Sequence, residues 1–169
     1  MTAGPDLLID AFGRIREIVD DVVAGLGPDD LAERLDEDTN SIGWLVWHLT
    51  RIQDDHLAGA AGTEQLWTAQ GWFDRFALPF ATGDTGYGHS PEEVAAVNGP
   101  SAELLGDYHG AVHDRTVEYL AEIDDKDLKR VVDRAWSPPV TLGIRLVSVV
   151  ADNLQHAGQA AFIRGMLGR

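Results

Sequence analysis

The stretch "WLVWHLTRIQDDH", residues 44–56, indicates both the fold class of the chain and a candidate site. Leu45, Leu49 and Ile52 recur at intervals of three and four, which predicts a helix with a buried apolar face. The same helix carries His48 and His56. Residues at this spacing lie on nearly one face but about 12 Å apart along the axis. Because zinc–nitrogen bonds are only about 2.0–2.1 Å long, one metal ion cannot bind both histidines.

Helical spacing extends outward from this stretch in both directions. Four long helices are predicted, at about residues 6–25, 41–59, 101–123 and 141–167. Asn40 or Ser41, Ser101 and Thr141 are suited to cap the last three of them. No segment shows convincing strand alternation. The sequence therefore predicts an all-α fold, a four-helix bundle.

The connections between these helices are polar, and one of them is long. Pro28 begins a short helix in "GPDDLAERL", and residues 60–100 form the least regular part of the chain. Within them, "LWTAQGWFDRFALPF" predicts a short helix and a loop, and Ser90, Pro91 and Glu93 form a capping box. A connection of this length in a compact domain is usually functional or a crossover.

Length and composition limit the class of protein. The chain has 169 residues, of which 44% are hydrophobic, so we expect one domain over residues 1–169. It contains no run of 18 apolar residues, which argues against a membrane span. The opening "MTAGPDLLID" has no basic segment before an apolar stretch, so we expect no signal peptide and a cytoplasmic protein.

Charge and cysteine content exclude several functions. The formal net charge is -15, and the 13 basic residues are scattered, so general binding to nucleic acid is disfavoured. The chain has no cysteine, which excludes disulfides, cysteine-based zinc sites and a cysteine nucleophile. A metal site must therefore use His, Asp and Glu, and any thiol chemistry must use a thiol that a substrate brings.

A weak internal repeat relates the two halves at an offset of 100 residues. Gly43 aligns with Gly143 and His56 with His156, while Asp30-Leu31 falls near Asp127-Leu128. This likeness predicts two helical hairpins of similar plan.

The strongest chemical feature is "DNLQH" in the last helix. Asp152 and His156 are four residues apart, so they lie on one helix face and can share a metal ion. A third ligand must come from another helix, and His48, deep in an apolar run, is better placed than His56 near the helix end. Zinc, nickel, iron and manganese all suit such ligands. The alternative is a hydrogen-bonded core histidine and a surface Asp–His pair.

A second pair competes with this one. His109 and His113 in "HGAVH" are also four residues apart, but a half-exposed polar edge explains them better than a metal site. The Glu-x-x-His pair of di-iron bundles is absent, as are HExxH, the P-loop, GxGxxG and GxSxG.

Two stretches carry a family resemblance. "NSIGWLVWHLTRIQDDH" and "LQHAGQAAFIRGML" resemble the DinB/YfiT-like superfamily, most closely its actinobacterial branch related to mycothiol-dependent maleylpyruvate isomerase and thiol S-transferases. The resemblance covers most of the chain. It implies a four-helix bundle with a long crossover between the second and third long helices. It also implies a divalent metal, zinc or nickel by expectation, and a low-molecular-weight thiol such as mycothiol.

The resemblance also implies roles for particular residues. His48 and His156 fall on the positions of the family's metal-binding histidines. Asp152 falls on the third ligand position, where the family has His or Glu, so this chain departs from both patterns there. Gln159, one turn after His156, is a candidate to orient a ligand. Arg164 is a candidate to meet a carboxylate of the thiol, and His56 and His89 are further candidates near the site.

These observations together predict a divalent-metal-dependent S-transferase or isomerase. In it the metal would activate a mycothiol-type thiol as thiolate towards a small electrophile. Aromatic side chains are candidates to wall the pocket: Trp44, Trp47, Trp72, Phe73 and Tyr87. A non-catalytic metal-binding or stress-response module and a metal-dependent hydrolase remain alternatives. A homodimer is compatible with the sequence.

Overall fold

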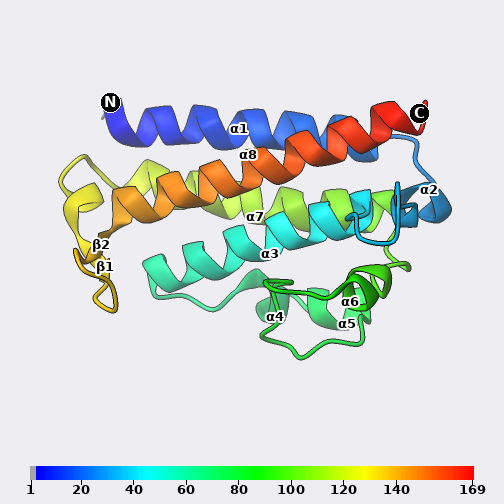
Figure 1. Cartoon of the computed structure of the whole chain (residues 1–169). Helices are drawn as coiled ribbons and strands as arrows, with labels where there is room; N and C mark the ends of the chain where they lie inside the picture. Colours follow the sequence, from blue (N-terminus) through cyan, green and yellow to red (C-terminus); the bar gives the residue numbers. More distant parts are fainter. Residues whose placement is uncertain (1–2) are drawn as a thin grey trace.

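The protein is a bundle of four long helices, seen in a computed structural model that describes residues 3–169. The sequence of colours in Figure 1 shows that α1 and α8 run in one direction and that α3 and α7 run in the other. The prediction of an all-α bundle is therefore confirmed. The four helices are α1 (Ala3–Val23), α3 (Ile42–Ala61), α7 (Ala102–Glu122) and α8 (Leu142–Met166).

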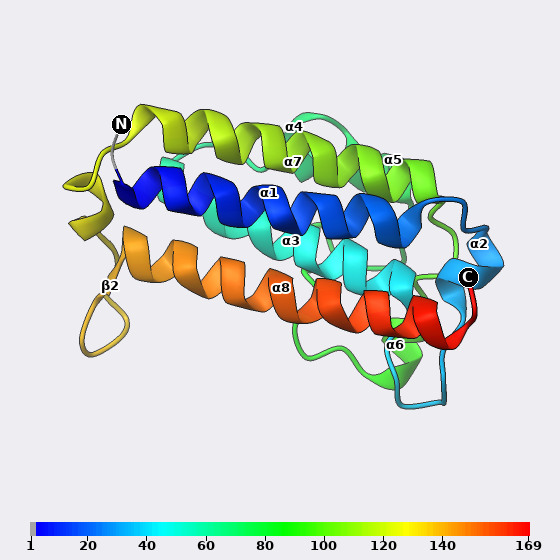
Figure 2. The same cartoon turned by 90° about the horizontal axis from the view of Figure 1, so that it is seen from above.

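The packing order decides which helices can share a site. α3 packs against α8 and α7, and α1 packs against the same two helices, while α1 and α3 lie diagonally across the core. Figure 2 shows α3 and α8 running in opposite directions, and the two helices pack against each other. Side chains from all four helices meet in the core, among them Ile15, Leu49, Tyr108 and Leu146. Because α3 and α8 are neighbours, residues from the middle of both can meet.

Side-chain caps fix where the helices begin. Ser41 rather than Asn40 caps α3, with its Oγ accepting a hydrogen bond from Trp44 N at 3.1 Å. Ser101 and Thr141 cap α7 and α8 in the same way, as predicted. Each cap satisfies a backbone N–H that has no partner within its helix. These caps set the register of the helices and so the height of each side chain in the bundle.

The crossover between α3 and α7 contains three short helices and lies along one side of α3, as Figure 1 shows. They are α4 (Leu66–Ala69), α5 (Trp72–Phe76) and α6 (Pro91–Ala95). The predicted capping box at Ser90 and Glu93 begins α6. A further short helix, α2 (Pro28–Ala32), starts at Pro28 as predicted and leads from α1 to α3.

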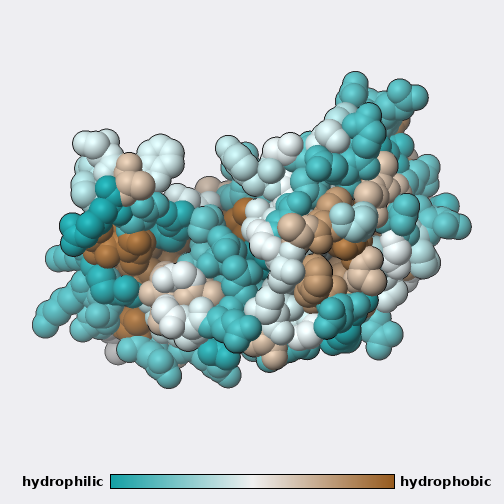
Figure 3. Space-filling view, turned by 90° about the horizontal axis from the view of Figure 1, so that it is seen from below, coloured by the Kyte–Doolittle hydropathy of each residue, from teal (hydrophilic) through white to brown (hydrophobic). Residues whose placement is uncertain are grey.

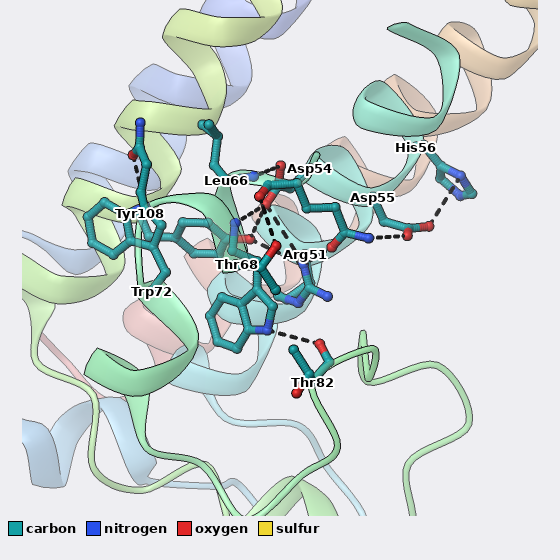
Figure 4. Close-up of polar contacts among 12 residues, drawn as sticks. Arg51, Asp54, Asp55, His56, Leu66, Thr68, Trp72, Thr82 and Tyr108 are labelled. Carbon is teal, nitrogen blue, oxygen red and sulfur yellow. Dashed lines mark hydrogen bonds and ion pairs between the residues drawn. The ribbon is translucent and has the colours of Figure 1, made fainter. Parts of the chain in front are cut away.

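A buried ionic network anchors this crossover to α3, and Figure 4 shows its members. Asp54 accepts hydrogen bonds from the backbone N–H groups of Leu66 and Trp67 and from the Tyr108 hydroxyl, at 2.8 to 2.9 Å. Burial raises the pKa of Tyr108 well above its ordinary value, so the hydroxyl stays a donor. Arg51, fully buried one turn earlier, donates to the carbonyl oxygen of Asp84 at 3.2 Å. The network therefore places residue 84 close to His48.

A small antiparallel hairpin precedes α8, contrary to the expectation that the chain has no strand. It comprises β1 (Val131–Asp133) and β2 (Val140–Thr141), after a short 3-10 helix, η1 (Asp127–Lys129). Val131 pairs with Thr141 and Asp133 with Val140, with an irregularity between the pairs. Strands of three and two residues are too short to show an alternating pattern, which is why the sequence gives no sign of them.

The two halves enter their second long helix in the same way. A Cβ at Gly43 would lie 3.1 Å from the carbonyl oxygen of Leu31, and one at Gly143 would lie 3.2 Å from that of Leu128. Both glycines thus permit a close approach to the short helical segment before them. The internal repeat seen in the sequence corresponds to this shared geometry.

The outer surface of the crossover side is mixed in character. Figure 3 shows hydrophilic residues over most of this face, with separate hydrophobic areas between them. Within residues 3–169, no helix combines the length and the apolar character that crossing a membrane requires.

Candidate metal centre

His48, Asp152 and His156 meet between α3 and α8. One donor atom from each lies within 4.8 Å of the others. The two imidazole rings are 4.9 Å apart, and His156 Nε2 lies 3.5 Å from Asp152 Oδ1. Asp152 and His156 come together because they are one turn apart on α8, and His48 joins them because α3 runs antiparallel beside α8. Two nitrogens and one carboxylate are a donor set that suits a divalent transition metal.

The ring of His48 is fixed by the crossover. Its Nδ1–H donates to the backbone oxygen of Thr85 at 2.5 Å, which leaves Nε2 as the nitrogen with a free lone pair. The Trp44 ring stacks on it, with centroids 4.6 Å apart and planes 15° from parallel. Gly86 closes the contact, because a Cβ there would lie 2.9 Å from His48 Nδ1. His48 is therefore held in one orientation from two sides.

The ring of His156 is oriented by its own helix. Its Nδ1–H donates to Gln159 Oε1 at 2.9 Å, which turns Nε2 towards Asp152 and His48. Both histidines thus use Nδ1 for a supporting hydrogen bond and present Nε2 to the same space. Metal-binding histidines in proteins almost always show such a bond from the nitrogen that does not bind the metal.

Asp152 supplies an independent sign of fit to a cation. Its Oδ2 is buried and has no hydrogen-bond partner among the residues that the structure describes. A buried carboxylate oxygen without a donor is costly, and a bound cation would remove that cost. The residues present therefore fit a divalent metal, even though Asp152 is shorter than the His or Glu of the family pattern.

The electrostatics of the three groups are coupled. Burial lowers the pKa of His48, which favours the neutral ring that a metal requires. The hydrogen bond with Asp152 raises the pKa of His156. Burial alone would raise the pKa of Asp152, but the hydrogen bond and the charge of His156 lower it overall. The raised pKa of His156 means that a cation at this cluster competes with a proton for the place beside Asp152.

The other residues singled out from the sequence are distributed unevenly around this cluster. Gln159 supports His156, as described. His89 accepts from Trp44 Nε1 at Nδ1 and donates from Nε2 to Asp84, with both bonds at 3.1 Å. His89 thus helps to position the stacked tryptophan but has no free nitrogen for a ligand.

His56 and Arg164 lie elsewhere. His56 contacts Arg145 at 3.2 Å, further along α3, and is not part of the three-residue group. Arg164 donates to the carbonyl oxygens of Val22 and Ala24, so it caps the end of α1 rather than reaching the cluster. Both residues lie eight positions beyond a cluster histidine on the same helix, which is too far along the helix axis for them to reach the cluster.

The His109 and His113 pair is not the half-exposed polar edge that the sequence suggested. His109 is fully buried, and neither of its ring nitrogens has a hydrogen-bond partner within residues 3–169. His113 lies near Asp114. No third histidine or carboxylate joins the pair in the described part of the chain.

Sequence reasoning missed the contributions of Thr85 and Gly86. A backbone oxygen carries no residue signature, so Thr85 could not have been found. The two glycines of "TGYGHS" were a signal for a tight turn, because glycine readily adopts positive φ. In the structure φ is 87° at Gly86 and 77° at Gly88. Of the aromatic candidates, Trp44 touches the cluster, whereas Trp72 packs against Tyr108 in the core and Tyr87 is exposed.

Two cavities lie on either side of the cluster along the groove between α3 and α8. One has a volume of about 530 Å³ and includes Leu45 and Gln159 in its wall. The other has a volume of about 230 Å³ and includes His56 and Arg145. Gln159, which supports His156, links the larger cavity to the cluster.

Comparisons with known proteins identify the family of this chain. The sequence profile of the family described as mycothiol-S-transferase matches residues 7–168. A solved structure, described as a conserved protein of its locus from Enterococcus faecalis, superposes with a TM-score of 0.92 and 31% identity, covering 100% of this chain and 99% of that one. A comparison with curated proteins found no match. With nearly the whole chain matched, the protein belongs to the mycothiol S-transferase family, within the DinB/YfiT-like superfamily.

Proposed function

We propose that the protein is a divalent-metal-dependent transferase that uses a low-molecular-weight thiol of the mycothiol type, with transfer or isomerisation of a small electrophile as its reaction. The observation that carries this proposal is the shared orientation of His48 and His156. Each presents Nε2 to the space beside Asp152 while its Nδ1 is occupied. The family match supports a thiol as the second substrate.

His48, Asp152 and His156 would hold the metal, and zinc or nickel suits this donor set. When bound, such a cation supplies positive charge that favours the deprotonated form of a nearby thiol. Three protein ligands leave room for a substrate atom. Thr85 and Gln159 hold the two rings in place, and Trp44 covers one side and limits the access of water.

The absence of cysteine from the chain fits this chemistry, because the nucleophilic sulfur must come from the thiol substrate. In a transfer, the thiol proton passes to solvent and the sulfur forms a bond to the electrophilic atom of the acceptor. The bond between that atom and its leaving group then breaks, and the leaving group departs with the electron pair. The protein contributes position and a sheltered groove.

Metal content tests the first half of the proposal. The purified protein is compared with His156→Ala and with His56→Ala, a matched change of a histidine on α3 outside the cluster. Mass spectrometry should find about one divalent ion per chain in the wild type and in His56→Ala. His156→Ala should lose most of that metal. An equal loss in both variants, or no metal after incubation of the wild type with zinc, nickel and manganese, would contradict the assignment.

Measurement of turnover tests the second half of the proposal, the thiol-dependent transfer. The zinc-loaded protein should consume 1-chloro-2,4-dinitrobenzene only when mycothiol is present, with release of chloride and formation of the thioether. Turnover that does not depend on the thiol would point instead to hydrolysis. A protein that binds metal but shows no turnover with a panel of electrophiles would support a non-catalytic role.

A further inference from the structure

The two cavities beside the metal cluster differ in chemistry, although both open onto the same groove. Leu45 is one turn before His48 on α3, and Gln159 is one turn after His156 on α8. Because the helices are antiparallel, both residues lie to the same side of the cluster. His56 and Arg145 lie to the opposite side, His56 about 12 Å from His48 along the helix. The cluster therefore separates the two cavities.

The larger cavity, of about 530 Å³, has a mainly apolar wall. Leu35 and Phe162 remain 42% and 64% exposed there, although large apolar side chains usually gain by being covered. None of the described residues in its wall carries a positive charge, and Asp38 contributes a negative one. This cavity suits an uncharged, largely apolar molecule and disfavours an anion.

The smaller cavity, of about 230 Å³, has a polar wall. Arg145 donates to Asp133 at 2.8 Å and contacts His56 at 3.2 Å, and Asp55 lies beside them. These groups offer hydrogen-bond donors and acceptors, and they include side chains of both positive and negative charge. A hydrophilic molecule with several hydroxyl and amide groups would find partners here, whereas an apolar molecule would leave them without hydrogen bonds.

We infer that the two cavities divide the substrates: the larger one binds the electrophile, as an uncharged and largely apolar molecule, and the polar one receives the hydrophilic part of the thiol. This inference rests on the proposed function. Dicarboxylates are then poor acceptors for this chain, because no cationic side chain stands in the described wall of the larger cavity to pair with them. Transfer to neutral aromatic or aliphatic electrophiles is the favoured reaction, in preference to isomerisation of a dianion.

Three glycines allow each cavity to be filled separately. Gly158 lies in the wall of the larger cavity and Gly59 in that of the polar one, while Gly13 on α1 lines neither. A Cβ at any of the three would meet no atom within 4 Å, and all three are helical. Replacement by leucine therefore adds the same side chain at three tolerant positions, and Gly13→Leu is the matched control.

Binding of a fluorescent probe tests the larger cavity without any need for activity. The probe is N-phenyl-1-naphthylamine, which is neutral and apolar, and 8-anilinonaphthalene-1-sulfonate has the same rings with a negative charge. In both metal-free and zinc-loaded protein, Gly158→Leu should weaken binding of the neutral probe by about tenfold or more, a loss of about 1.4 kcal/mol. Gly59→Leu and Gly13→Leu should leave it unchanged. The sulfonate should bind several-fold more weakly than the neutral probe.

Equal binding of the neutral probe to Gly158→Leu and to the wild type would overturn the assignment of the larger cavity. Tighter binding of the sulfonate at that cavity would overturn its preference for neutral molecules. Both results are independent of metal loading and of turnover, so they remain decisive even if the proposed function fails.

Kinetics then test the division of substrates. With zinc-loaded protein, mycothiol and 1-chloro-2,4-dinitrobenzene, Gly158→Leu should raise KM for the electrophile and leave KM for mycothiol unchanged. Gly59→Leu should do the reverse. The same KM change for both substrates in either variant would show that the cavities do not divide them.

Discussion

At the scale of the residue, the two nitrogens of each histidine decide what it can do. His48 and His156 use Nδ1 for a hydrogen bond and keep Nε2 free, whereas His89 uses both nitrogens within the protein. A ligand-binding histidine is thus recognised by the partner of its other nitrogen. His56 lacks such a supporting acceptor, since its Nδ1 faces the guanidinium of Arg145.

Gln159 should contribute to metal affinity through His156. Gln159→Ala removes the acceptor of the Nδ1–H bond, so the ring loses its fixed orientation. Affinity for zinc should fall by about 10- to 100-fold, as for other supporting residues of metal sites. Competition with a chromophoric chelator measures it. Gln155→Ala is the control, since Gln155 donates only to the carbonyl oxygen of Ala151, and an equal effect in both variants would contradict the role of Gln159.

His109 should make the protein sensitive to mild acid. Burial lowers its pKa to about 3, whereas the unfolded chain has the ordinary value of 6.5. Between these values the unfolded state binds the proton and the folded state does not. The free energy of unfolding should therefore fall by roughly 1 kcal/mol for each pH unit below 6.5 on account of this residue.

Urea denaturation between pH 7 and pH 5 measures this dependence. His109→Leu should remove that part of the slope without a large loss at neutral pH, because neither ring nitrogen has a partner to lose. His113→Leu, one turn further along α7, should keep the slope of the wild type. A slope that is unchanged in His109→Leu would exclude His109 as its source.

The sequence predicted part of the cluster for reasons that the structure makes clear. Helical spacing alone places Asp152 and His156 on one face, and the resemblance pointed to His48 on another helix. The supporting bond from Thr85 could not be predicted, because it depends on the path of the crossover. His109 was interpreted wrongly, since its neighbours Tyr108 and Val112 face the core and take it with them.

At the scale of the element, the crossover is a structural part of the cluster as well as a connection. From within the core, Asp54 holds the start of the crossover at Leu66 and Trp67, and Arg51 holds its middle at Asp84. Thr85, the next residue, then contacts His48. Breaking a buried ion pair by removing one partner typically costs about 3–5 kcal/mol. The position of the His48 ring thus depends on a network that does not belong to the cluster itself.

Gly86 should matter for two separate reasons, backbone conformation and space. Gly86→Ala places a Cβ within 2.9 Å of His48 and of Trp47, at a φ of 87°. Gly88→Ala imposes a similar strain at a φ of 77° but meets open space. The unfolding free energy of Gly86→Ala should be lower than that of Gly88→Ala by about 1–3 kcal/mol.

Zinc affinity should fall in Gly86→Ala and stay near the wild-type value in Gly88→Ala, because only the first change displaces the His48 ring. Denaturation curves and zinc titrations of the two variants, side by side, separate strain from displacement. Similar values for both would show that Gly86 does not contact the cluster closely enough to affect it.

The long helices were predictable as elements, whereas the hairpin before α8 was not. The four long helices have enough turns for the helical spacing of their apolar residues to be recognised. Ser101 and Thr141 mark where two of them, α7 and α8, begin. The strands β1 and β2 depend on pairing with each other rather than on a pattern within either. At the open end of this hairpin, Leu142 N donates to Arg130 O at 2.8 Å and so joins the hairpin to the start of α8.

At the scale of the whole molecule, the cluster joins helices that are far apart in the chain. α3 and α8 belong to different halves, and their contact is formed only in the folded state. Anything that binds this cluster stabilises the folded protein, because the unfolded chain does not bring the three donors together.

Zinc at about 100 times its dissociation constant should therefore raise the unfolding free energy by about 3 kcal/mol. Thermal denaturation with and without zinc measures the effect. His48→Ala, which removes the donor from α3, should show little stabilisation by zinc. Full stabilisation of His48→Ala would mean that zinc binds elsewhere on the folded protein.

The matched approaches of Gly43 to Leu31 and of Gly143 to Leu128 are what a duplicated ancestral hairpin would leave behind. Immediately after such a duplication, both halves of the chain would have the same sequence. In the present one, His156 still has a counterpart in His56, but Asp152 corresponds to Ile52 and His48 to Ser148. The second half thus supplies two of the three donors and the first half supplies one, and His56 is the histidine that a rotationally related second cluster would use.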